Sequence, residues 1–338
     1  MKHSEDTIPI VALDLLRQGQ RICIATVIET WGSAPRPPGS QLLLTSEGIM
    51  DGSISGGCVE SAVLHYGLDA IRIGKCQLHE FGVSDETAFS VGLSCGGKIK
   101  VLIEPVNFGQ GIPKKILEKL SELISRNEKF FLVTDLNSFE RSIHTFASSR
   151  EVENFSKNME KSSALSTEKS FVIGSRFFNY FGPMPRLVII GAVHIAQALV
   201  KIAELAAFEI IVIDPRDIFS SPVRFPSSKV IVEWPDKAIP QLAPNTSTAI
   251  VFLTHDPKID DSGLKIALRS DAFYVGCLGS RKTHKKRRDR LLKMGFSDGD
   301  INRIHAPVGL DIGAITPEEI AVSIMSEVIL KLRKIELR

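Results

Sequence analysis

The chain has 338 residues, and its 41 basic and 39 acidic side chains leave a formal net charge of +2. Because domains usually contain roughly 100–200 residues, this length predicts two domains, or two domains and an insert. The balanced charge excludes a whole-protein field that would attract nucleic acid or an anionic membrane, and the 43% hydrophobic content argues against a disordered or fibrous chain.

The N-terminus and the cysteines indicate the compartment. The first six residues are mostly polar and acidic, no apolar h-region of a signal peptide follows them, and no stretch approaches about 18 consecutive apolar residues. We therefore expect neither secretion nor a membrane span, and we predict a soluble cytoplasmic protein. The five cysteines form no Cys-x-x-Cys pair, which argues against a structural zinc site or a disulfide scaffold. Cys23 and Cys277 lie in apolar runs and are predicted to be small buried hydrophobes.

Helical and strand-like patterns follow one another in the first hundred residues. Apolar residues three or four positions apart predict amphipathic helices, whereas β-branched runs bounded by glycine or proline predict strands. We place the end of this first domain near residue 108. The predicted elements are a helix over residues 8–16, strands over 21–28 and 41–44, a helix over 59–73, and strands over 76–81 and 98–106.

Three glycine-rich segments interrupt this pattern. Residues 31–39 are too rich in proline and glycine for regular structure, and residues 51–60 run into a predicted helix. Cys58 lies beside the start of that helix, where the positive end of the helix dipole lowers a thiol pKa and favours the thiolate. Cys95, in residues 92–97, also adjoins a pair of glycines. Both thiols are candidates for a functional site, and the alternative is two buried thiols in tight turns.

The middle section, residues 109–184, gives a less regular signal. Its pattern predicts a helix from about Pro113, a strand over residues 129–134, two further β-rich stretches and a polar surface insert over 151–170. The pattern leaves open whether this section is a separate subdomain or completes the first domain.

From residue 185 to residue 338, strand-like runs alternate with helical segments, as a doubly wound parallel sheet requires. We predict an α/β protein in which an N-terminal α/β domain is followed by this C-terminal Rossmann-like domain. The last helix has a strong start signal, with Thr316 as N-cap, Pro317 as its first residue and Glu319 closing a capping box. The predicted strands cover residues 187–190, 210–213, 230–232, 249–253 and 273–275.

The turn after the first of these strands has the frame of a dinucleotide-binding loop. Gly191 follows the strand, His194 begins the next helix, and Asp214 lies roughly 20 residues further on, where such an acid bonds a ribose hydroxyl. Val193 occupies the position at which a missing side chain normally lets a phosphate approach the backbone. We therefore predict the fold but only weak NAD(P) binding. His194 is either near a ligand or a solvated surface residue.

Two later turns place polar residues at the carboxyl ends of strands, where open α/β sheets bind ligands. His255 belongs either to such a site or to an ordinary polar turn. Gly279, Ser280 and Arg281 join a strand to a helix, so backbone N–H groups, a hydroxyl and a guanidinium could converge on a phosphate.

The helix that begins at Arg281 is strongly basic. Residues 281–293 include eight lysines and arginines and no aromatic residue on which a base could stack. We interpret this run first as a solvated helix face, then as a docking patch for a partner, and last as a nucleic-acid site.

Several of these segments, taken together and in order, resemble one protein family. Residues 32–39, 52–60 and 92–97 closely resemble the N-terminal domain of the XdhC/CoxI family. The resemblance covers nearly the whole chain except much of residues 109–181, although Val193 departs from the family's Gly-x-Gly-His pattern. The segments that resemble the family's Rossmann domain are residues 191–199, 214–216, 254–256, 279–281, 305–313 and 316–319.

The resemblance implies an accessory protein for molybdenum hydroxylases such as xanthine dehydrogenase. Family members hold molybdenum cofactor, support its sulfuration with a cysteine desulfurase and deliver it to the apoenzyme, so a chaperone is expected rather than a catalyst. A homodimer is expected, and Cys58 and Cys95 are the implied contacts to the metal. The implied cofactor-binding residues are Arg36, Ser55, Gly56, Gly57, Cys58, Cys95, Gly96 and Gly97 in the first domain, and Gly191, His194, Asp214, His255, Gly279, Ser280 and Arg281 in the second.

The main alternative is an NAD(P)-dependent oxidoreductase. The chain lacks the groups of cysteines that ligate the iron–sulfur clusters of xanthine dehydrogenase, so it is not that dehydrogenase itself. A small reductase remains as the alternative, and Val193 argues against it. Neither nucleic acid nor a membrane is an expected partner.

Overall fold

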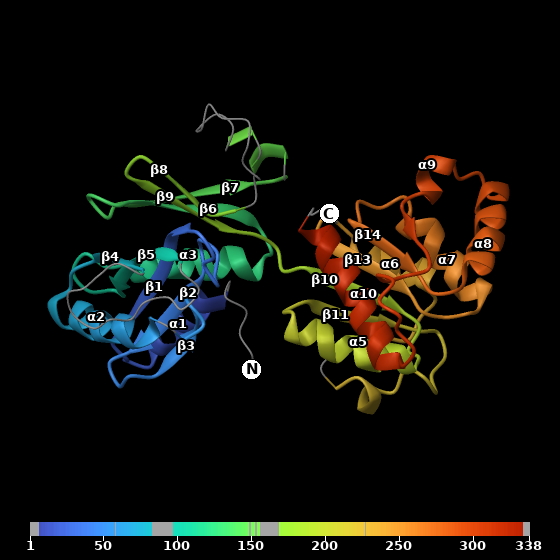
Figure 1. Cartoon of the computed structure of the whole chain (residues 1–338), viewed down its shortest axis with the longest axis horizontal. Helices are drawn as coiled ribbons and strands as arrows, with labels where there is room; N and C mark the ends of the chain where they lie inside the picture. The colour runs from blue at the N-terminus through green and yellow to red at the C-terminus, as the bar shows by residue number, and fades with distance from the viewer. Residues whose placement is uncertain are drawn as a thin grey trace. The chain divides into compact units, whose positions relative to one another are not determined.

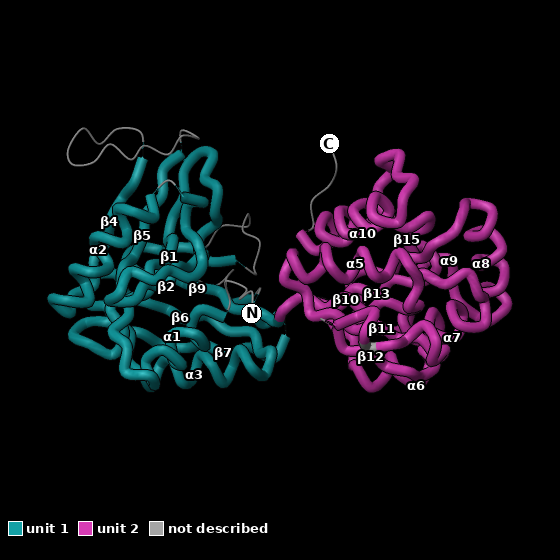
Figure 2. Tube along the Cα trace, turned by 90° about the horizontal axis from the view of Figure 1, so that it is seen from below, with its two compact units in different colours: residues 1–183 teal, residues 184–338 magenta. Residues whose placement is uncertain are grey.

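The computed structural model describes residues 7–57, 59–82, 97–148, 150–152, 154–155, 169–226 and 228–333. The chain forms two compact units, unit 1 over residues 1–183 and unit 2 over residues 184–338, coloured teal and magenta in Figure 2. Unit 1 therefore includes the middle section together with the N-terminal region. None of the helices in the described ranges is long and apolar enough to cross a membrane.

Unit 1 is built on an antiparallel sheet in the order β3-β2-β1-β5-β4 (Figure 1). Its central strand, β1, is buried along most of its length because both faces of the sheet are covered. Helix α2 packs on one face, where Val63 and Ala70 meet Cys23 and Val101. The elements of this part are α1 (Ile8–Arg17), β1 (Ile22–Trp31), β2 (Gln41–Thr45), β3 (Met50–Gly52), α2 (Glu60–Ile73), β4 (Gln77–Phe81) and β5 (Lys98–Pro105).

The middle section covers the other face of this sheet. Leu117 and Leu120 of α3 pack with Ile24 of β1 and with Phe130 and Phe181 of a second antiparallel sheet, whose strand order is β7-β6-β9-β8. Unit 1 thus has two sheets with helices packed against them. The elements of the middle section are α3 (Lys114–Ser125), β6 (Lys129–Asp135), β7 (Arg141–Phe146), β8 (Phe171–Ile173) and β9 (Arg176–Phe181).

Unit 2 is a parallel six-stranded sheet in the order β12-β11-β10-β13-β14-β15. Numbered within the unit, this is the 3-2-1-4-5-6 order of a doubly wound dinucleotide-binding fold, so the predicted fold class is confirmed. The predicted strands occur within a residue or two of their predicted bounds, and β15 is an addition. The strands are β10 (Arg186–Ile190), β11 (Glu209–Ile213), β12 (Lys229–Ile231), β13 (Thr248–Phe252), β14 (Tyr274–Cys277) and β15 (Ile304–His305).

Helices cover both faces of this sheet, as its continuously apolar strands require. Leu199 of α5 and Ile324 of α10 pack on one face against Ile189 and Val251. The second face is covered by α6, α7 and α8, and also by the short helix α9. The helices are α5 (His194–Leu205), α6 (Pro235–Leu242), α7 (Pro257–Ala267), α8 (Arg281–Lys293), α9 (Asp298–Ile301) and α10 (Pro317–Leu332).

Several local predictions are confirmed. Thr316 accepts a hydrogen bond from the N–H of Glu319, and the Glu319 carboxylate accepts one from the N–H of Thr316, which forms the predicted capping box of α10. Cys23 and Cys277 are fully buried in hydrophobic clusters. Burial raises the pKa of the Cys277 thiol to about 12, so this cysteine is an inert packing residue.

Candidate functional site

Parts of the three glycine-rich segments of unit 1 come together at one end of the main sheet. They belong to residues 31–39, to residues 51–57 and to Gly97, the last residue of the segment 92–97. The antiparallel pairing places Trp31 at the end of β1 opposite Lys98 at the start of β5. A side chain at Gly97 would bring its Cβ to 2.8 Å from the carbonyl oxygen of Ser33, so only glycine fits there. The Arg36 Nε atom donates to the carbonyl oxygen of Ser53 at 3.5 Å.

Glu60, the first residue of α2, organises the loop over residues 53–57. Its Oε1 atom accepts hydrogen bonds from the backbone N–H groups of Ile54 and Ser55 at 3.3 and 3.0 Å, and from the Ser53 hydroxyl at 3.1 Å. Its Oε2 atom accepts the N–H of Gly57 at 2.9 Å and the hydroxyl of Ser55. One carboxylate therefore fixes most of the loop, and the sequence pattern did not single it out.

Burial alone would raise the pKa of Glu60, but hydrogen bonds from Ser55 and Ser53 outweigh it and lower the pKa to about 2. The carboxylate is thus ionised and occupies the amide-lined position in which such a loop would otherwise hold an external anion. The loop amides of Ile54, Ser55 and Gly57 are consequently committed to the protein's own side chain.

The exposed side of the same loop remains open to a ligand. Gly56 and Gly57 have φ angles of +75° and +116°, and no atom lies within 4 Å of the place where a Cβ would stand on either residue. Ser55, by contrast, is buried, and its hydroxyl also accepts a hydrogen bond from the N–H of Val59 at 3.0 Å. Ser55 therefore shapes the loop, and the two glycines permit close approach to its backbone.

The two cysteines predicted to contact the metal lie outside the described residues. Cys58, Cys95 and Gly96 are not among the described residues, so their roles stay predictions. Among the residues that are described, no group of three or more His, Cys, Asp and Glu side chains is arranged to hold a metal ion.

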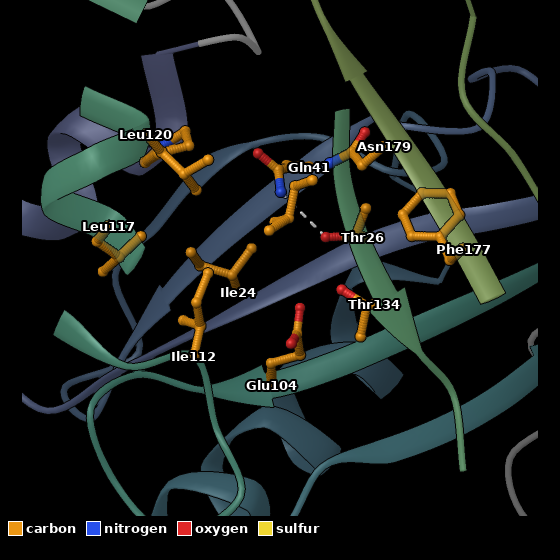
Figure 3. Close-up of a pocket in the computed structure, with 12 residues that line it drawn as sticks. Ile24, Thr26, Gln41, Glu104, Ile112, Leu117, Leu120, Thr134, Phe177 and Asn179 are labelled. Carbon is orange, nitrogen blue, oxygen red and sulfur yellow. Dashed lines mark hydrogen bonds between the residues drawn. The ribbon is translucent and has the colours of Figure 1, made fainter. Parts of the chain in front are cut away.

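A small internal cavity lies between the two sheets of unit 1 (Figure 3). Its volume of about 10 Å³ is close to what a single water molecule needs. The Gln41 Nε2 atom donates to the Thr26 hydroxyl at 3.1 Å, and the Gln41 Oε1 atom has no hydrogen-bond partner among the described residues. The cavity is therefore too small for a cofactor and is a feature of the core.

In unit 2, the Gly191 turn is closed by contacts within the chain. Gly191 has a φ of +106°, and a Cβ there would lie 2.6 Å from the Thr254 side chain, so glycine is required by packing. Asp214 is fully buried and accepts the N–H of Ala192 at 2.8 Å. It also accepts the Arg216 side chain at 2.8 and 2.6 Å, and these bonds lower its pKa although burial alone would raise it.

This arrangement does not present Asp214 to a ribose, because both carboxylate oxygens already have partners. Val193 is the N-cap residue of α5, and His194, the first helical residue, is exposed. Cofactor binding by Gly191, His194 and Asp214 stays a prediction, and the Ala192 amide and the Asp214 acid of this turn are already paired with each other.

The other polar turns lie at the ends of β13 and β14. His255 lines a cavity together with residues of α8. The Ser280 hydroxyl caps α8 by accepting the N–H of Thr283 at 3.2 Å, and Arg281 is exposed and is not among the residues that line the cavity. Gly279 has a φ of +125° at the strand-to-helix turn. Phosphate binding by Ser280 and Arg281 stays a prediction.

The interpretation of residues 281–293 as a solvated helix face is wrong for Arg287. Only 2% of this residue is exposed, because α8 packs on the second face of the sheet, where Leu291 joins the apolar cluster and Arg287 donates to the carbonyl oxygen of Leu278. Lys282, Lys286, Arg287 and Arg290 line the cavity with His255, and the sequence pattern did not separate them from the other basic residues. Their spacing of three or four residues is the signal that could have identified one shared face.

Residues 305–309 owe their placement to Glu327 of α10. The Glu327 carboxylate accepts hydrogen bonds from the Tyr274 hydroxyl at 2.5 Å and the Gly309 N–H at 2.8 Å, and its Oε1 atom lies 2.8 Å from His305 Nδ1. Burial would raise the pKa of Glu327, but these bonds lower it. This stretch is therefore a structural link between α10 and the sheet edge.

Two family models match the chain. Residues 187–328 match the model described as the XdhC Rossmann domain, and residues 15–82 match the one described as the XdhC and CoxI family. Together these matches cover well over half of the chain and both units.

Individual relatives match over nearly the full length. A molybdenum cofactor insertion chaperone, PaoD, from Escherichia coli (strain K12) is 26% identical over 95% of this chain and 87% of the relative. A probable xanthine dehydrogenase subunit from Bacillus subtilis (strain 168) is 26% identical over 93% of this chain and 94% of the relative. A crystal structure described as that of a xanthine dehydrogenase from Bacillus halodurans has the same fold, with a TM-score of 0.76 at 24% identity over 97% of this chain and 96% of that one.

Proposed function

The chain belongs to the XdhC and CoxI family, and we propose from this premise that it inserts molybdenum cofactor into a molybdenum hydroxylase such as xanthine dehydrogenase. The observation that supports this most is the similarity to a molybdenum cofactor insertion chaperone over 95% of the chain. Two of the glycine-rich segments and Gly97 meet at one end of the unit 1 sheet, and this is the position we propose for the cargo.

The cargo is a phosphorylated pterin whose dithiolene sulfurs hold molybdenum. In this proposal Cys58 and Cys95 contact the metal or hold sulfur, because thiolates are the protein ligands best suited to soft metals and sulfur chemistry. Gly56 and Gly57 leave open space beside the backbone, so a large group can come close to the loop. Arg36, Gly96 and Gly97 complete the proposed site.

The proposed partners are those that membership of the family implies. An apo molybdenum hydroxylase receives the cofactor, and a cysteine desulfurase supplies the sulfur for its sulfuration. The protein acts in the cytoplasm as a homodimer and serves as a chaperone rather than as a catalyst. The residues of unit 2 assigned to the cofactor are those of the Gly191 turn, the His255 turn and the turn that starts α8.

The protein is expected to bind about one equivalent of molybdenum cofactor per chain and NADPH only weakly. NADPH should bind weakly because the Ala192 N–H already binds Asp214 at 2.8 Å and because Val193 crowds the phosphate position. The cofactor content is measured by molybdenum and pterin analysis of protein purified anaerobically from a cofactor-producing host. The affinity for NADPH is measured by titration. Micromolar affinity for NADPH without detectable pterin would favour the alternative function, an NAD(P)-dependent reductase.

Cys58→Ser and Cys95→Ser are expected to preserve folding while lowering cofactor retention and activation of the target hydroxylase at least about tenfold, because serine is a far weaker ligand for soft metals. The matched control is Cys277→Ser, at a fully buried cysteine of unit 2, which should change stability alone. Molybdenum content and hydroxylase activation are measured for all three variants. Equal values in the parent and in both site variants contradict the assignment of the two thiols.

A further inference from the structure

A cavity of about 240 Å³ lies in unit 2, beside the carboxyl ends of β13 and β14. The turn at His255 and the start of α7 form one wall, and α8 forms the other. It lies at the carboxyl edge of the parallel sheet, the edge at which open α/β sheets bind ligands, next to the switch point between β10 and β13. The lining residues are His255, Pro257, Asp260, Lys282, Thr283, Lys286, Arg287 and Arg290.

One face of α8 supplies most of the cavity's charge. Lys282, Lys286 and Arg290 are four residues apart, so they lie in one row along the helix. Arg287 and Thr283 form the adjacent row, which explains why all five line the same cavity. Other basic residues of the helix, among them Lys285 and Lys293, are not among the lining residues.

Arg287 is a buried cation with unused donors. Its Nη2 atom donates to the Leu278 carbonyl oxygen at 3.1 Å and to Asp260 at 3.4 Å. Its Nε and Nη1 atoms are buried and have no hydrogen-bond partner among the described residues. Because a buried charge is nearly always fully hydrogen-bonded, a guanidinium with three unpaired N–H groups leaves positive charge uncompensated beside the cavity, and this charge favours an anionic ligand.

The charge of the cavity is not balanced by its carboxylates. Arg290 is paired with Asp261 at 2.5 Å, and Asp260 is the one carboxylate among the lining residues. Asp260 also accepts the hydroxyl of Thr254 at 2.5 Å. Lys282 and Lys286 have no carboxylate partner within the described part of the chain. An excess of positive charge therefore faces the cavity.

We propose that this cavity binds a phosphate-bearing small molecule, with Lys282 and Lys286 holding the phosphate above the guanidinium of Arg287. A phosphomonoester or diphosphate suits several converging cations better than a single carboxylate does. The cavity volume of about 240 Å³ has room for such a group and for part of the molecule that carries it. The inference rests on the proposed function at His255, which that function assigns to the cofactor, and extends it to Lys286 and Arg287, to which it assigns no ligand.

The test is calorimetric titration of the full-length protein with inorganic pyrophosphate and with inorganic phosphate at constant ionic strength. The Lys282→Ala/Lys286→Ala double variant should bind pyrophosphate about tenfold more weakly or worse, because it loses two charge-assisted contacts. Lys285→Ala/Lys293→Ala, which removes the same charge from the same helix away from the cavity, should bind like the parent. All four lysines are exposed, so both variants are expected to fold.

Two results would overturn the proposal. One is that the parent binds neither pyrophosphate nor phosphate at millimolar concentration. The other is that both double variants lose affinity equally, which would show diffuse attraction to a basic helix rather than a site. This titration uses no pterin and no hydroxylase. Its failure would reject the phosphate site and leave the proposed function standing, and failure of the proposed function would leave the phosphate site standing.

A second arm identifies the source of the phosphate. Protein loaded with molybdenum cofactor is titrated with pyrophosphate in parallel with the unloaded protein. Loss of pyrophosphate binding on loading assigns the cavity to the phosphate of the pterin, and unchanged binding assigns it to a separate phosphorylated compound such as a nucleotide.

Discussion

Glu60→Ala is expected to abolish hydroxylase activation and to lower the free energy of unfolding by about 2 kcal/mol or more, because it leaves buried loop donors unpaired. The Glu60 carboxylate accepts three backbone N–H groups and two hydroxyls between residues 53 and 57. Without it, the Gly57 N–H loses its partner, and the Ser53 hydroxyl that holds the Gly56 N–H loses its own anchor at the proposed site. Chemical denaturation and an activation assay measure the two effects.

The control for this variant is Glu47→Ala, which removes an exposed carboxylate from a turn of the same unit. It should change neither stability nor activation. If Glu60→Ala activates the hydroxylase as well as Glu47→Ala does, the loop does not contribute to cofactor transfer.

The pH dependence of Glu60 has a definite sign. Its pKa in the folded protein is about 2, below the ordinary 4.5. Its stabilising effect is thus fully present above pH 4.5 and is lost as the pH falls toward 2. The stability difference between the parent and Glu60→Gln should shrink across this window, and denaturation at several pH values measures it.

Glu327→Ala is expected to lower the free energy of unfolding by about 3 kcal/mol or more, since removing one partner from a buried polar network leaves the others unpaired. The groups left are the Tyr274 hydroxyl, the Gly309 N–H and the His305 ring. The same helix offers Lys331→Ala as an exposed control, which should stay close to the parent. A loss as small as that of Lys331→Ala would show that the network does not hold residues 305–309.

The sequence predicted the features that depend on local patterns. The capping box of α10 needs only Thr316 and Glu319 at their spacing, and the alternation of strands and helices after residue 185 needs only apolar runs and turns. These signals depend only on residues close together in the sequence, so the fold of unit 2 could be predicted from them.

Features that depend on tertiary packing could not be predicted in the same way. Arg287 and Lys285 look alike in the sequence, and only the docking of α8 buries the first and exposes the second. Asp214 has the position of a ribose-binding acid, yet Arg216, two residues later, occupies its carboxylate. Glu60 becomes recognisable only when the loop folds back over the start of α2.

In the proposed function, the carboxylate of Glu60 also has a kinetic consequence, because an insertion chaperone must release what it binds. The protein's own anion already orders the 53–57 loop before any ligand arrives. The loop therefore loses little conformational entropy when a ligand binds. Arrival is then limited by diffusion and orientation, and the lifetime of the complex depends on the contacts with the ligand alone. Such a loop can exchange its cargo quickly without first unfolding or refolding.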